Sequence, residues 1–487
     1  MCTRKRSVEW IPRARPCRRG CSIPQSGSRS IWTPSSMPPL NLLRHAPADA
    51  VSRLLDRTEP LPASADVVII GGGIMGCSAA WYLSRANLKV VLLEKNRIAS
   101  QQSGRNWGFV RSLYRDPAEL ALAAQALSLW PGLRAELGHE TGWRRSGCLF
   151  LCADEAERRS YQAWLAEAGG RVSDTRMLSA DEVAARFPLV SPRTEGGIIA
   201  ESDGQAEPTL ATLAFARAAV GAGAVVLEDC GVSALDVAGG SIRGVQTEHG
   251  PVRAPIVICA AGAQTFRLLQ GLDVQLPQKV VRSTVSLTAP LPPMGLPCFV
   301  GYGLGLRQRP DGSCIIATDA GTDIDLTLDS LRASRYFVRE VVRNRKGFSF
   351  RLGKPFINDL HTRLSVPKSD WAIKPRDPDI APNTHRVRDN RKRFADLFAG
   401  MPPVEIVKSW AGNIDVMPDA LPVIDAAWPA RGLIIATGFS GHGFGLGPAV
   451  GSTLAALARG AEPKTDLAPF SADRYLRGAY SRPYAAI

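Results

Sequence analysis

Three glycines near the start of the chain have the spacing of a phosphate-binding turn. Gly71, Gly73 and Gly76 follow a short β-branched run in a G-x-G-x-x-G pattern. The first glycine of such a turn allows the tight bend, the second lets the backbone approach a pyrophosphate, and the third lets the next helix pack closely on the strand. The anion then lies on the helix N-terminus. We therefore expect these glycines, with Ile74 and Met75 between them, to bind a dinucleotide.

An acidic residue follows where it would contact a ribose. We expect a strand over 67–70, a helix, and a second strand over 89–93 that ends on Glu94. A carboxylate there accepts hydrogen bonds from a ribose diol and repels a 2′-phosphate, which favours FAD or NAD(H) over NADP. Lys95 belongs to the same predicted site. The alternative is a glycine-rich turn that binds nothing.

The composition is that of a globular protein with two or three domains. The chain has 487 residues, 45% of them hydrophobic, and a net charge of +14. Half of this excess lies in residues 1–36, which lack the apolar core of a secretory signal. We interpret this segment as a disordered or wrongly assigned start, with Met37 as the candidate first residue. Organelle targeting and a nucleic-acid-binding arm are the alternatives, and no folded nucleic-acid motif supports the second.

The ten cysteines are scattered and form no C-x-x-C pair, so we expect no metal site. Cys77, Cys230 and Cys259 lie in apolar surroundings and are interpreted as buried residues in a reducing compartment. We therefore expect a cytoplasmic protein. No apolar run approaches the roughly 18 residues of a membrane span, while peripheral membrane association stays open.

The rest of the chain alternates between segments that return to the cofactor and a second lobe. Polar residues over 99–108 follow the second strand and are well placed to contact the ligand. We expect helices over 120–137, 155–168, 180–186 and 208–222, strands over 148–151, 224–228, 254–261, 280–287 and 314–318, a hairpin over 231–250, a basic helical region over 331–354 and 386–393, and finally a strand over 432–436, a glycine-rich loop over 438–451 and a helix to about 459.

Several motifs occur in order along the chain and together resemble a known family. After the glycine turn these are SGRNWG at 103–108, ESDGQAEP at 201–208, CAAG at 259–262, WAGNIDVMPDALPVI at 410–424 and GFSGHGFG at 438–445. They are similar to the FAD-dependent D-amino-acid oxidase and glycine/sarcosine oxidase superfamily, particularly to sarcosine oxidase β-subunit-like proteins. The resemblance covers about 64–465.

The resemblance implies an α/β fold in which a Rossmann-like FAD-binding domain is interleaved with an α+β substrate domain. The discontinuous FAD-binding domain would comprise 64–110, 195–270 and 405–465. The substrate domain would comprise 111–194 and 271–404, with a leader over 1–63 and a tail over 466–487.

The resemblance also implies which residues bind FAD. The glycine turn would hold the pyrophosphate and Glu94 the adenosine ribose. The last loop would place N–H groups near the pyrimidine edge of the flavin, where they stabilise the negative charge of the reduced ring. Further implied contacts are Ser103, Gly104 and Arg105 beside the ribityl-pyrophosphate and flavin, Val232 at the adenine, Gly262 on the phosphate side, and Gly438, Gly441, His442 and Gly443 in the last loop.

Four residues are the candidates for the substrate side. Arg111 has the guanidinium fork that suits a carboxylate, with a surface arginine as the alternative. His442 could hydrogen-bond substrate or flavin, or be structural. Phe444 and Trp107 could line the pocket or pack in the core. Gln205 is a weaker candidate.

Two positions depart from monomeric sarcosine oxidases. Those enzymes carry a carboxylate-binding lysine where this chain has Gly445, and a flavin-attaching cysteine near the position of Trp410. We therefore expect non-covalent FAD and do not expect a plain sarcosine oxidase.

The resemblance implies an FAD-dependent oxidoreductase that oxidises the C–N bond of an amino acid or a related primary or secondary amine. Hydride transfer from the α-carbon to flavin N5 would give an imine that hydrolyses, and oxygen, a quinone or a partner protein would accept the electrons. Two alternatives stay open. One is a flavin dehydrogenase of a hydroxy acid or glycerol phosphate, and the other is an FAD-binding subunit of a larger oxidase complex.

Overall fold

The computed structural model describes most of the chain after the leader. The described ranges are 60–172, 174–318, 322–343, 348–374, 376, 380–426 and 428–484. The basic segment 1–36, and with it the interpretation of the chain start, lies outside them.

A six-stranded sheet assembles from segments far apart in the sequence, in the order β21-β22-β13-β1-β2-β9. Every neighbouring pair is parallel except β21 and β22. The strands are β1 Val67–Ile70, β2 Val90–Leu93, β9 Val225–Leu227, β13 Ile256–Cys259, β21 Val423–Asp425 and β22 Leu433–Thr437. The chain runs outward from β1 through β2 to β9 and then returns to β13 on the other side of β1. This reversal is the topological switch point, where α/β sheets bind their ligands at the carboxyl ends of the strands.

Both faces of this sheet are covered, which explains its continuous apolar strands. Val67 and Ile69 pack against four helices on one face, and Val68 and Ile70 pack on the other face against a three-stranded sheet and a short helix. The helices are α2 Ile74–Ser84, α4 Leu120–Leu129, α8 Pro208–Gly221 and α13 Gly443–Ala458; the opposite layer is β10 Val232–Ala238, β11 Ser241–Thr247, β12 Gly250–Arg253 and α9 Thr265–Gln270.

Helices α2 and α13 run parallel and in close contact. Ser78 Oγ donates a hydrogen bond to the backbone oxygen of Gly447 at 2.9 Å. A Cβ added at Gly447 or Gly451 would lie 2.4 Å from Ile74 or 2.2 Å from Ser78, so only glycine permits this approach. A Cβ at Gly443, the first residue of α13, would lie 3.1 Å from Met75 Cε in the first turn of α2, so the two N-termini lie side by side.

The second large sheet has ten strands, in the order β19-β18-β14-β17-β16-β15-β5-β7-β6, with β20 also paired to β14. Its strands are β5 Cys148–Leu151, β6 Thr175–Leu178, β7 Gly197–Ala200, β14 Lys279–Thr288, β15 Cys298–Gly301, β16 Leu304–Gln308, β17 Cys314–Thr318, β18 Thr322–Asp325, β19 Phe348–Arg351 and β20 Ile406–Val416. Strands β7 and β20 fall within ranges that the sequence groups with the cofactor domain, yet they pair in this sheet. The division into two domains stays a proposal.

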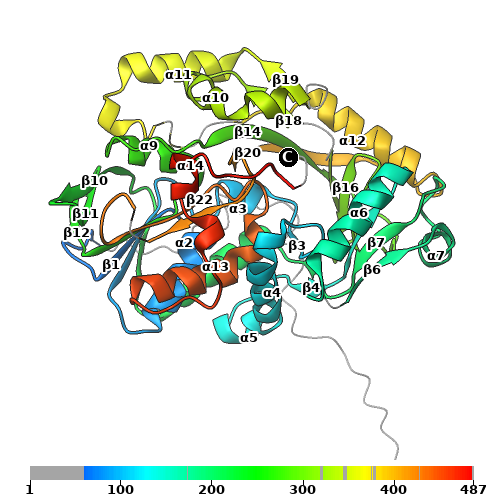
Figure 1. The fold of residues 1–487 in the computed structure, drawn as a ribbon, viewed down its shortest axis with the longest axis horizontal. Coiled ribbons are helices and arrows are strands. Elements are labelled where there is room, and N and C mark those ends of the chain that lie inside the picture. The colour runs from blue at the N-terminus through cyan, green and yellow to red at the C-terminus, as the bar shows by residue number, and fades with distance from the viewer. Residues whose placement is uncertain are drawn as a thin grey trace, which may run out of the picture. The chain divides into compact units, whose positions relative to one another are not determined.

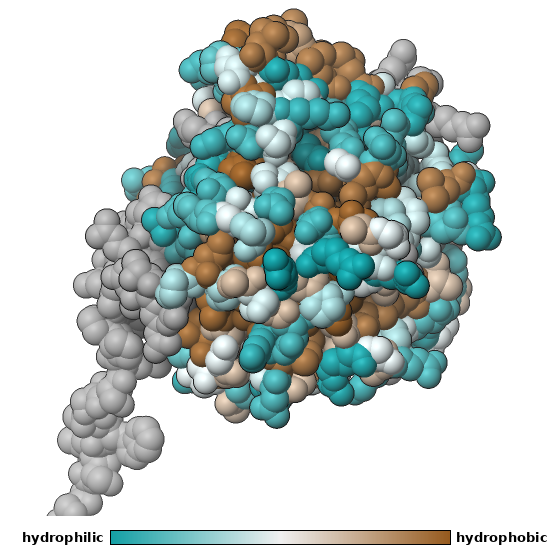
Figure 2. All heavy atoms as spheres, turned by 90° about the vertical axis from the view of Figure 1, so that its left-hand side faces the viewer, coloured by the Kyte–Doolittle hydropathy of each residue, from teal (hydrophilic) through white to brown (hydrophobic). Residues whose placement is uncertain are grey.

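Helices cover the second sheet at its ends and along its outer face. They are α6 Glu155–Ala168, α7 Ala180–Arg186, α10 Leu328–Arg343, α11 Lys354–Ser365 and α12 Thr384–Leu397. Figure 1 shows α10 and α11 as an outer layer above β14 and β18, on the side away from α2 and α13. In Figure 2, hydrophobic side chains gather at this end of the protein.

Short elements connect the two sheets near the polar loop 99–108. A small sheet pairs β3 Phe109–Val110 and β4 Arg144–Arg145 with β8 Gly204–Gln205, and the loop itself contains α3 Gln102–Arg105. The remaining described helices are the 3₁₀ turns at 117–119, 130–132, 262–264, 368–370 and 468–470, α5 Leu133–Leu137 and α14 Asp473–Leu476.

Most of the expected elements are present. The strand over 148–151 and the helices over 155–168 and 180–186 are confirmed at their predicted bounds. The helix expected over 120–137 is instead interrupted by the 3₁₀ turn Trp130–Gly132. Pro131 lacks the N–H that a continuous helix requires, which accounts for the interruption. Cys77, Cys230 and Cys259 are buried, as predicted.

Within the described ranges, no helix combines the length and the apolar character needed to cross a membrane.

Candidate active site

A cavity of about 780 Å³ opens at the carboxyl ends of β1 and β13 and is lined by both large sheets. The glycine turn, the polar loop 99–108 and the last glycine-rich loop line it from the first sheet. Residues of β14 and β20, including Val281 and Ile414, line it from the second sheet. Its volume lies within the range of small-molecule and cofactor sites. The switch point of the first sheet therefore opens onto a site that both halves of the protein complete.

The glycine turn has the geometry that its sequence predicts. Gly71 has φ +109°, and a Cβ there would lie 2.4 Å from the backbone oxygen of Ala260. A Cβ at Gly76 would lie 2.0 Å from the backbone oxygen of Gly71, so this residue lets α2 pack against the turn rather than line the cavity. At Gly73 a Cβ would meet only Ser103 Oγ, at 3.1 Å. The added atom would otherwise extend into the space that a bound phosphate requires.

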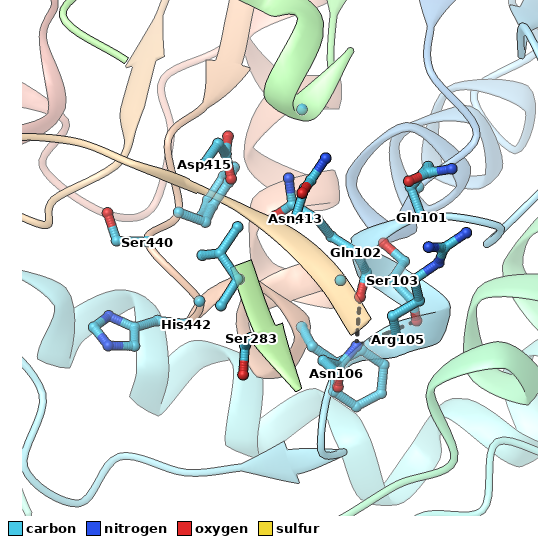
Figure 3. A pocket seen from close by; sticks show the side chains of 18 of the residues that line it. Gln101, Gln102, Ser103, Arg105, Asn106, Ser283, Asn413, Asp415, Ser440 and His442 are labelled. Atoms are coloured by element: carbon cyan, nitrogen blue, oxygen red, sulfur yellow. Dashed lines mark hydrogen bonds between the residues drawn. The ribbon is translucent and has the colours of Figure 1, made fainter. Parts of the chain in front are cut away.

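The polar loop fixes the start of α2. Ser103 Oγ accepts a hydrogen bond from the backbone N–H of Ile74 at 2.8 Å. Asn106 Nδ2 donates to the backbone oxygens of Gln102 and Ser103, and Figure 3 shows these side chains together on one side of the cavity. Gly104 does not line the cavity, because it packs against Ala99 too closely for a Cβ.

Glu94 lines the cavity at the end of β2 and already supports the turn. Its Oε2 accepts from the N–H of Gly72 at 2.6 Å, and its Oε1 accepts from the N–H of Asn96 at 2.8 Å. A carboxylate has about four lone-pair positions, so acceptor capacity is left for a ribose diol. Burial raises the pKa of Glu94, and these two N–H donors oppose that shift.

The last loop is anchored by a buried acid that the sequence did not single out. Asp415 Oδ2 accepts from the N–H of Gly438 at 2.8 Å, from Gln278 Nε2 at 2.8 Å and from Thr437 Oγ1 at 3.2 Å. Asp415 is 1% exposed, and burial raises its pKa. Through this hydrogen bond Gly438 fixes the start of the loop without lining the cavity. Gly441, further along the loop, lines the cavity.

Buried charges support His442 at the start of α13. Glu119 is 1% exposed, and its Oε2 lies 3.7 Å from His442 Nδ1 and 3.6 Å from Arg115 Nη1. Arg115 is 2% exposed and donates from Nη2 to the backbone oxygen of His442 at 3.0 Å. Neither Glu119 oxygen has a hydrogen-bond partner among the described residues. A buried carboxylate therefore faces the imidazole, and the distance between Glu119 Oε2 and His442 Nδ1 is slightly longer than a hydrogen bond.

The pKa shifts in this cluster have clear causes. Burial lowers the pKa of His442, and the Glu119 carboxylate opposes that shift. Burial also acts on Glu119 and would raise its pKa, but His442 and Arg115 outweigh this and lower it. The pKa of Arg115 falls to about 10, chiefly through burial. At neutral pH these shifts favour an ionised Glu119 beside a neutral imidazole, which can accept a proton.

Arg111 lines the cavity beside Phe150. Its Nη1 donates to the backbone oxygen of Leu113, and its Cζ lies 5.4 Å from the centroid of the Phe150 ring. A Cβ at Gly445 would lie 3.1 Å from Val110 Cα and 3.6 Å from Arg111 N. Gly445 thus allows the segment that carries Arg111 to lie against the start of α13, and a lysine side chain would have to displace this backbone.

Trp107 and Phe444 both line the cavity and both pack in the interior. Phe444 is 7% exposed, with its ring centroid 5.5 Å from that of Trp130. Trp107 lies against Gly305, where a Cβ would clash with its ring at 2.1 Å. The structure thus combines the two roles that the sequence left as alternatives.

Most of the predicted site residues share this one cavity. Those that line it are Gly71, Gly73, Ile74, Met75, Glu94, Lys95, Ser103, Arg105, Trp107, Arg111, Val232, Gly262, Gly441, His442, Gly443 and Phe444. Gly76, Gly104 and Gly438 lie behind it, and Trp410 donates from Nε1 to the backbone oxygen of Arg105 at 3.0 Å. The assignment of these residues to cofactor or substrate stays a proposal.

Sequence reasoning missed the polar residues that the second sheet and the buried cluster contribute. Ser283 and Asn413 line the cavity from β14 and β20 and are among the side chains drawn in Figure 3. Asp415 lies inside a motif that carries the family resemblance, which could have identified it. For Arg115 and Glu119 the only signal is their i, i+4 spacing, which surface ion pairs share.

The cavity also has the electrostatic features of an anion-binding dinucleotide site. The N-termini of α2 and α13 both reach it, and neither helix is capped by the side chain of its N-cap residue. Gln264 lines the cavity, and its buried Oε1 has no hydrogen-bond partner among the described residues. Two helix N-termini that their own N-cap side chains do not cap, together with an unpartnered amide oxygen, are suited to a large polar ligand.

Comparison with known families decides which ligand this is. The family described as FAD dependent oxidoreductase matches residues 66–457. The chain belongs to this family. FAD is therefore its cofactor, and the cavity fits FAD through the glycine turn, Glu94 and the two helix N-termini.

Individual relatives and solved structures are similar to most of this chain. The β subunit of sarcosine oxidase from Rhizobium meliloti (strain 1021) is 26% identical over 426 residues, which cover 85% of this chain and 89% of the subunit. The mitochondrial sarcosine dehydrogenase of Mus musculus is 24% identical over 426 residues, covering 86% of this chain and 42% of the dehydrogenase. The chain thus spans less than half the length of that relative. The structure of L-amino acid deaminase from Proteus myxofaciens in complex with anthranilate has a TM-score of 0.78 and 27% identity, covering 86% of this chain and 95% of the deaminase.

Proposed function

We propose that this protein oxidises the C–N bond of an amino acid or a related amine. The observation that carries the proposal is that Arg111 and His442 line the same cavity as the FAD-binding turn. A guanidinium pairs with a carboxylate, and a neutral imidazole accepts a proton from an ammonium group. The relatives named for sarcosine and L-amino acids act on molecules that carry both groups, which supports the same substrate class here.

The chain contributes binding and proton transfer to this reaction. Arg111 binds the substrate carboxylate, and Trp107 and Phe444 enclose its side chain. His442 takes the proton from the substrate ammonium, while Glu119 orients the imidazole through Nδ1 and stabilises the imidazolium that forms. The substrate then loses a hydride from its α-carbon, and the resulting imine is hydrolysed by water. When bound, FAD supplies the two-electron acceptor for this step.

The direct test is an anaerobic titration of the purified full chain. The panel would contain D- and L-amino acids, N-methyl amino acids, simple amines, hydroxy acids and glycerol phosphate. We expect an amine with a carboxylate to bleach the flavin absorbance, and readmitted air would show whether oxygen is the electron acceptor. Bleaching by a hydroxy acid or glycerol phosphate alone would refute the amine proposal. A flavin that no compound bleaches would favour an FAD-binding subunit that requires partners.

Two substitutions test the assigned roles. Arg111→Lys should weaken substrate binding with a smaller effect on the limiting rate of flavin reduction, because a lysine loses the bidentate geometry. His442→Gln should lower the limiting rate and remove its dependence on a group whose pKa lies below the ordinary histidine value. The matched controls are Arg145→Lys and His385→Gln, since both side chains are exposed. Equal effects in the variants and their controls would exclude the proposed roles.

A further inference from the structure

Helix α11 exposes its apolar face and buries its polar one. Ile357, Leu360 and Leu364 recur at helical spacing and are 63%, 40% and 78% exposed. On the opposite side, Asp359 and Thr362 are both 9% exposed. A helix on the surface of a globular protein normally has the reverse arrangement.

Ion pairs on the inner side hold the helix in this orientation. Asp359 accepts from Arg267 Nη2 at 3.3 Å and from Arg363 Nε at 3.2 Å. Asp329 of α10 joins the same two arginines, accepting from Arg267 Nη2 at 2.7 Å and from Arg363 Nη2 at 2.6 Å. The four side chains are 6% to 21% exposed. Since the buried charges fix the helix, the exposure of its apolar face is a property of the folded protein.

Neighbouring elements extend this apolar surface. Among the described residues, nine large hydrophobic side chains are exposed, and seven of them lie between 331 and 364. This concentration corresponds to the hydrophobic area at the top of Figure 2, where α10 and α11 lie. We call it the outer apolar face; its residues are Leu331, Val338, Phe350, Leu352, Ile357, Leu360 and Leu364.

The surroundings of the outer apolar face are basic. The segment 328–368 contains ten Lys or Arg residues and three Asp or Glu residues. Asp329 and Asp359, the acids whose side chains are described, are engaged in the inner ion pairs. Arg335, Lys354 and Lys368 are exposed. A partner for this face must therefore accept apolar side chains and carry negative charge.

We propose that the outer apolar face docks the protein on an anionic lipid surface. A basic amphipathic helix lies in the plane of a membrane, with its apolar side chains among the acyl chains and its lysines and arginines at the acidic headgroups. Helix α11 is already presented in this way, with its polar side attached to the protein body.

Docking would bring the membrane close to the cavity. Ala333 and Phe337 on the inner side of α10 pack against Val281 and Val416 of β14 and β20. Val281 also lines the cavity. Thus α10 contacts the docking surface on one side and the strands of the cavity on the other. The proposal itself does not depend on the substrate.

Vesicle co-sedimentation of the full FAD-loaded chain tests this proposal. We expect binding to vesicles of phosphatidylcholine with phosphatidylglycerol, weaker binding to phosphatidylcholine alone, and loss of binding at high salt. The triple variant Ile357→Ser/Leu360→Ser/Leu364→Ser should reduce partitioning about tenfold or more. Flavin content, thermal stability and turnover should stay unchanged, because the replaced side chains are exposed.

The matched control is Val407→Ser/Leu476→Ser. These two apolar side chains are 42% and 63% exposed and do not belong to the outer apolar face. All three proteins carry the same basic segment 1–36, so only a loss confined to the triple variant supports the proposal. Equal vesicle binding by all three proteins would overturn it, as would no binding by the wild type. Self-association that the triple variant abolishes, without vesicle binding, would show instead that this face pairs two copies.

Discussion

The buried ion pair between Glu207 and Arg307 supports one wall of the cavity. Glu207 Oε1 accepts from Arg307 Nη1 at 2.8 Å and from Arg309 Nε at 3.2 Å. The side chains of Glu207 and Arg307 are 16% and 2% exposed. Arg307 also donates to the backbone oxygen of Trp107, which lines the cavity. Burial alone would raise the pKa of Glu207, but the two arginines outweigh it and lower the pKa to about 2.

This shift gives the expected cost of replacing Glu207 with glutamine. A fall from 4.5 to about 2 corresponds to about 3 kcal/mol, since one pKa unit is about 1.4 kcal/mol. Removing one partner of a buried pair costs about 3 to 5 kcal/mol, which agrees. Because the folded pKa lies below the unfolded one, the stabilisation is complete above about pH 4.5 and is lost as the pH falls toward 2. Glu207→Gln should thus lower the free energy of unfolding by about 3 kcal/mol at neutral pH, and progressively less in acid.

Urea unfolding, followed by tryptophan fluorescence at a series of pH values, measures both effects. The control is Glu201→Gln, whose short 2.6 Å ion pair with Arg186 is about 40% exposed on both sides. This exposed pair should contribute much less than the buried one. The reasoning is refuted if the two variants are equally stable at neutral pH. It is also refuted if the deficit of Glu207→Gln stays constant into acid.

Three further predictions concern the cofactor, the proton acceptor and a buried lysine. Gly73→Ala should keep the fold, because its Cβ meets only Ser103 Oγ, but should lower FAD content about tenfold or more; a yellow protein with the wild-type flavin ratio would contradict this. Glu119→Gln should lower the pKa of His442 further, since the carboxylate opposes the effect of burial. The acid limb of flavin reduction should therefore move to lower pH, and an unmoved limb would separate Glu119 from proton transfer. Burial lowers the pKa of Lys279 from 10.5 to about 8, so the unfolded chain binds more protons between these values and stability rises with pH there. Lys279→Met should raise the free energy of unfolding by at most about 3 kcal/mol at neutral pH, with a gain that disappears above about pH 10.5; urea unfolding at neutral and alkaline pH measures it.

The local pattern of the sequence was sufficient to predict the glycine turn and the strands that flank it. Gly71 and Gly76 occupy a tight turn and a close helix contact that almost any side chain would block, and Gly73 leaves the adjoining space open to a phosphate. The apolar runs on either side of them are the buried strands β1 and β2, and their type and approximate bounds follow from the local apolar pattern. These features are determined within about 30 residues, so they could be predicted without knowledge of the tertiary structure.

The placement of the residues around the substrate side of the cavity could not be predicted locally, because it depends on contacts between distant segments. Glu119 is 323 positions before His442, and only the packing of α13 against the 115–119 segment brings a buried carboxylate to the imidazole. In β20, Asp415 reaches the last loop because this strand pairs with β14, a pairing that no local periodicity specifies.

The orientation of α11 was likewise decided by tertiary contacts and not by the local sequence. The sequence alone predicted a basic helical region over 331–354, but strand β19 interrupts this range and α11 begins only at its last residue. The direction in which its apolar side chains point was decided by Arg267 on α9, which pairs with Asp359 and draws the polar face of the helix inward. Local propensity determined that these elements form, because it depends on residues near in sequence. Tertiary packing decided which charges are buried together and which apolar face stays exposed, because those free energies depend on residues that only the fold brings into contact.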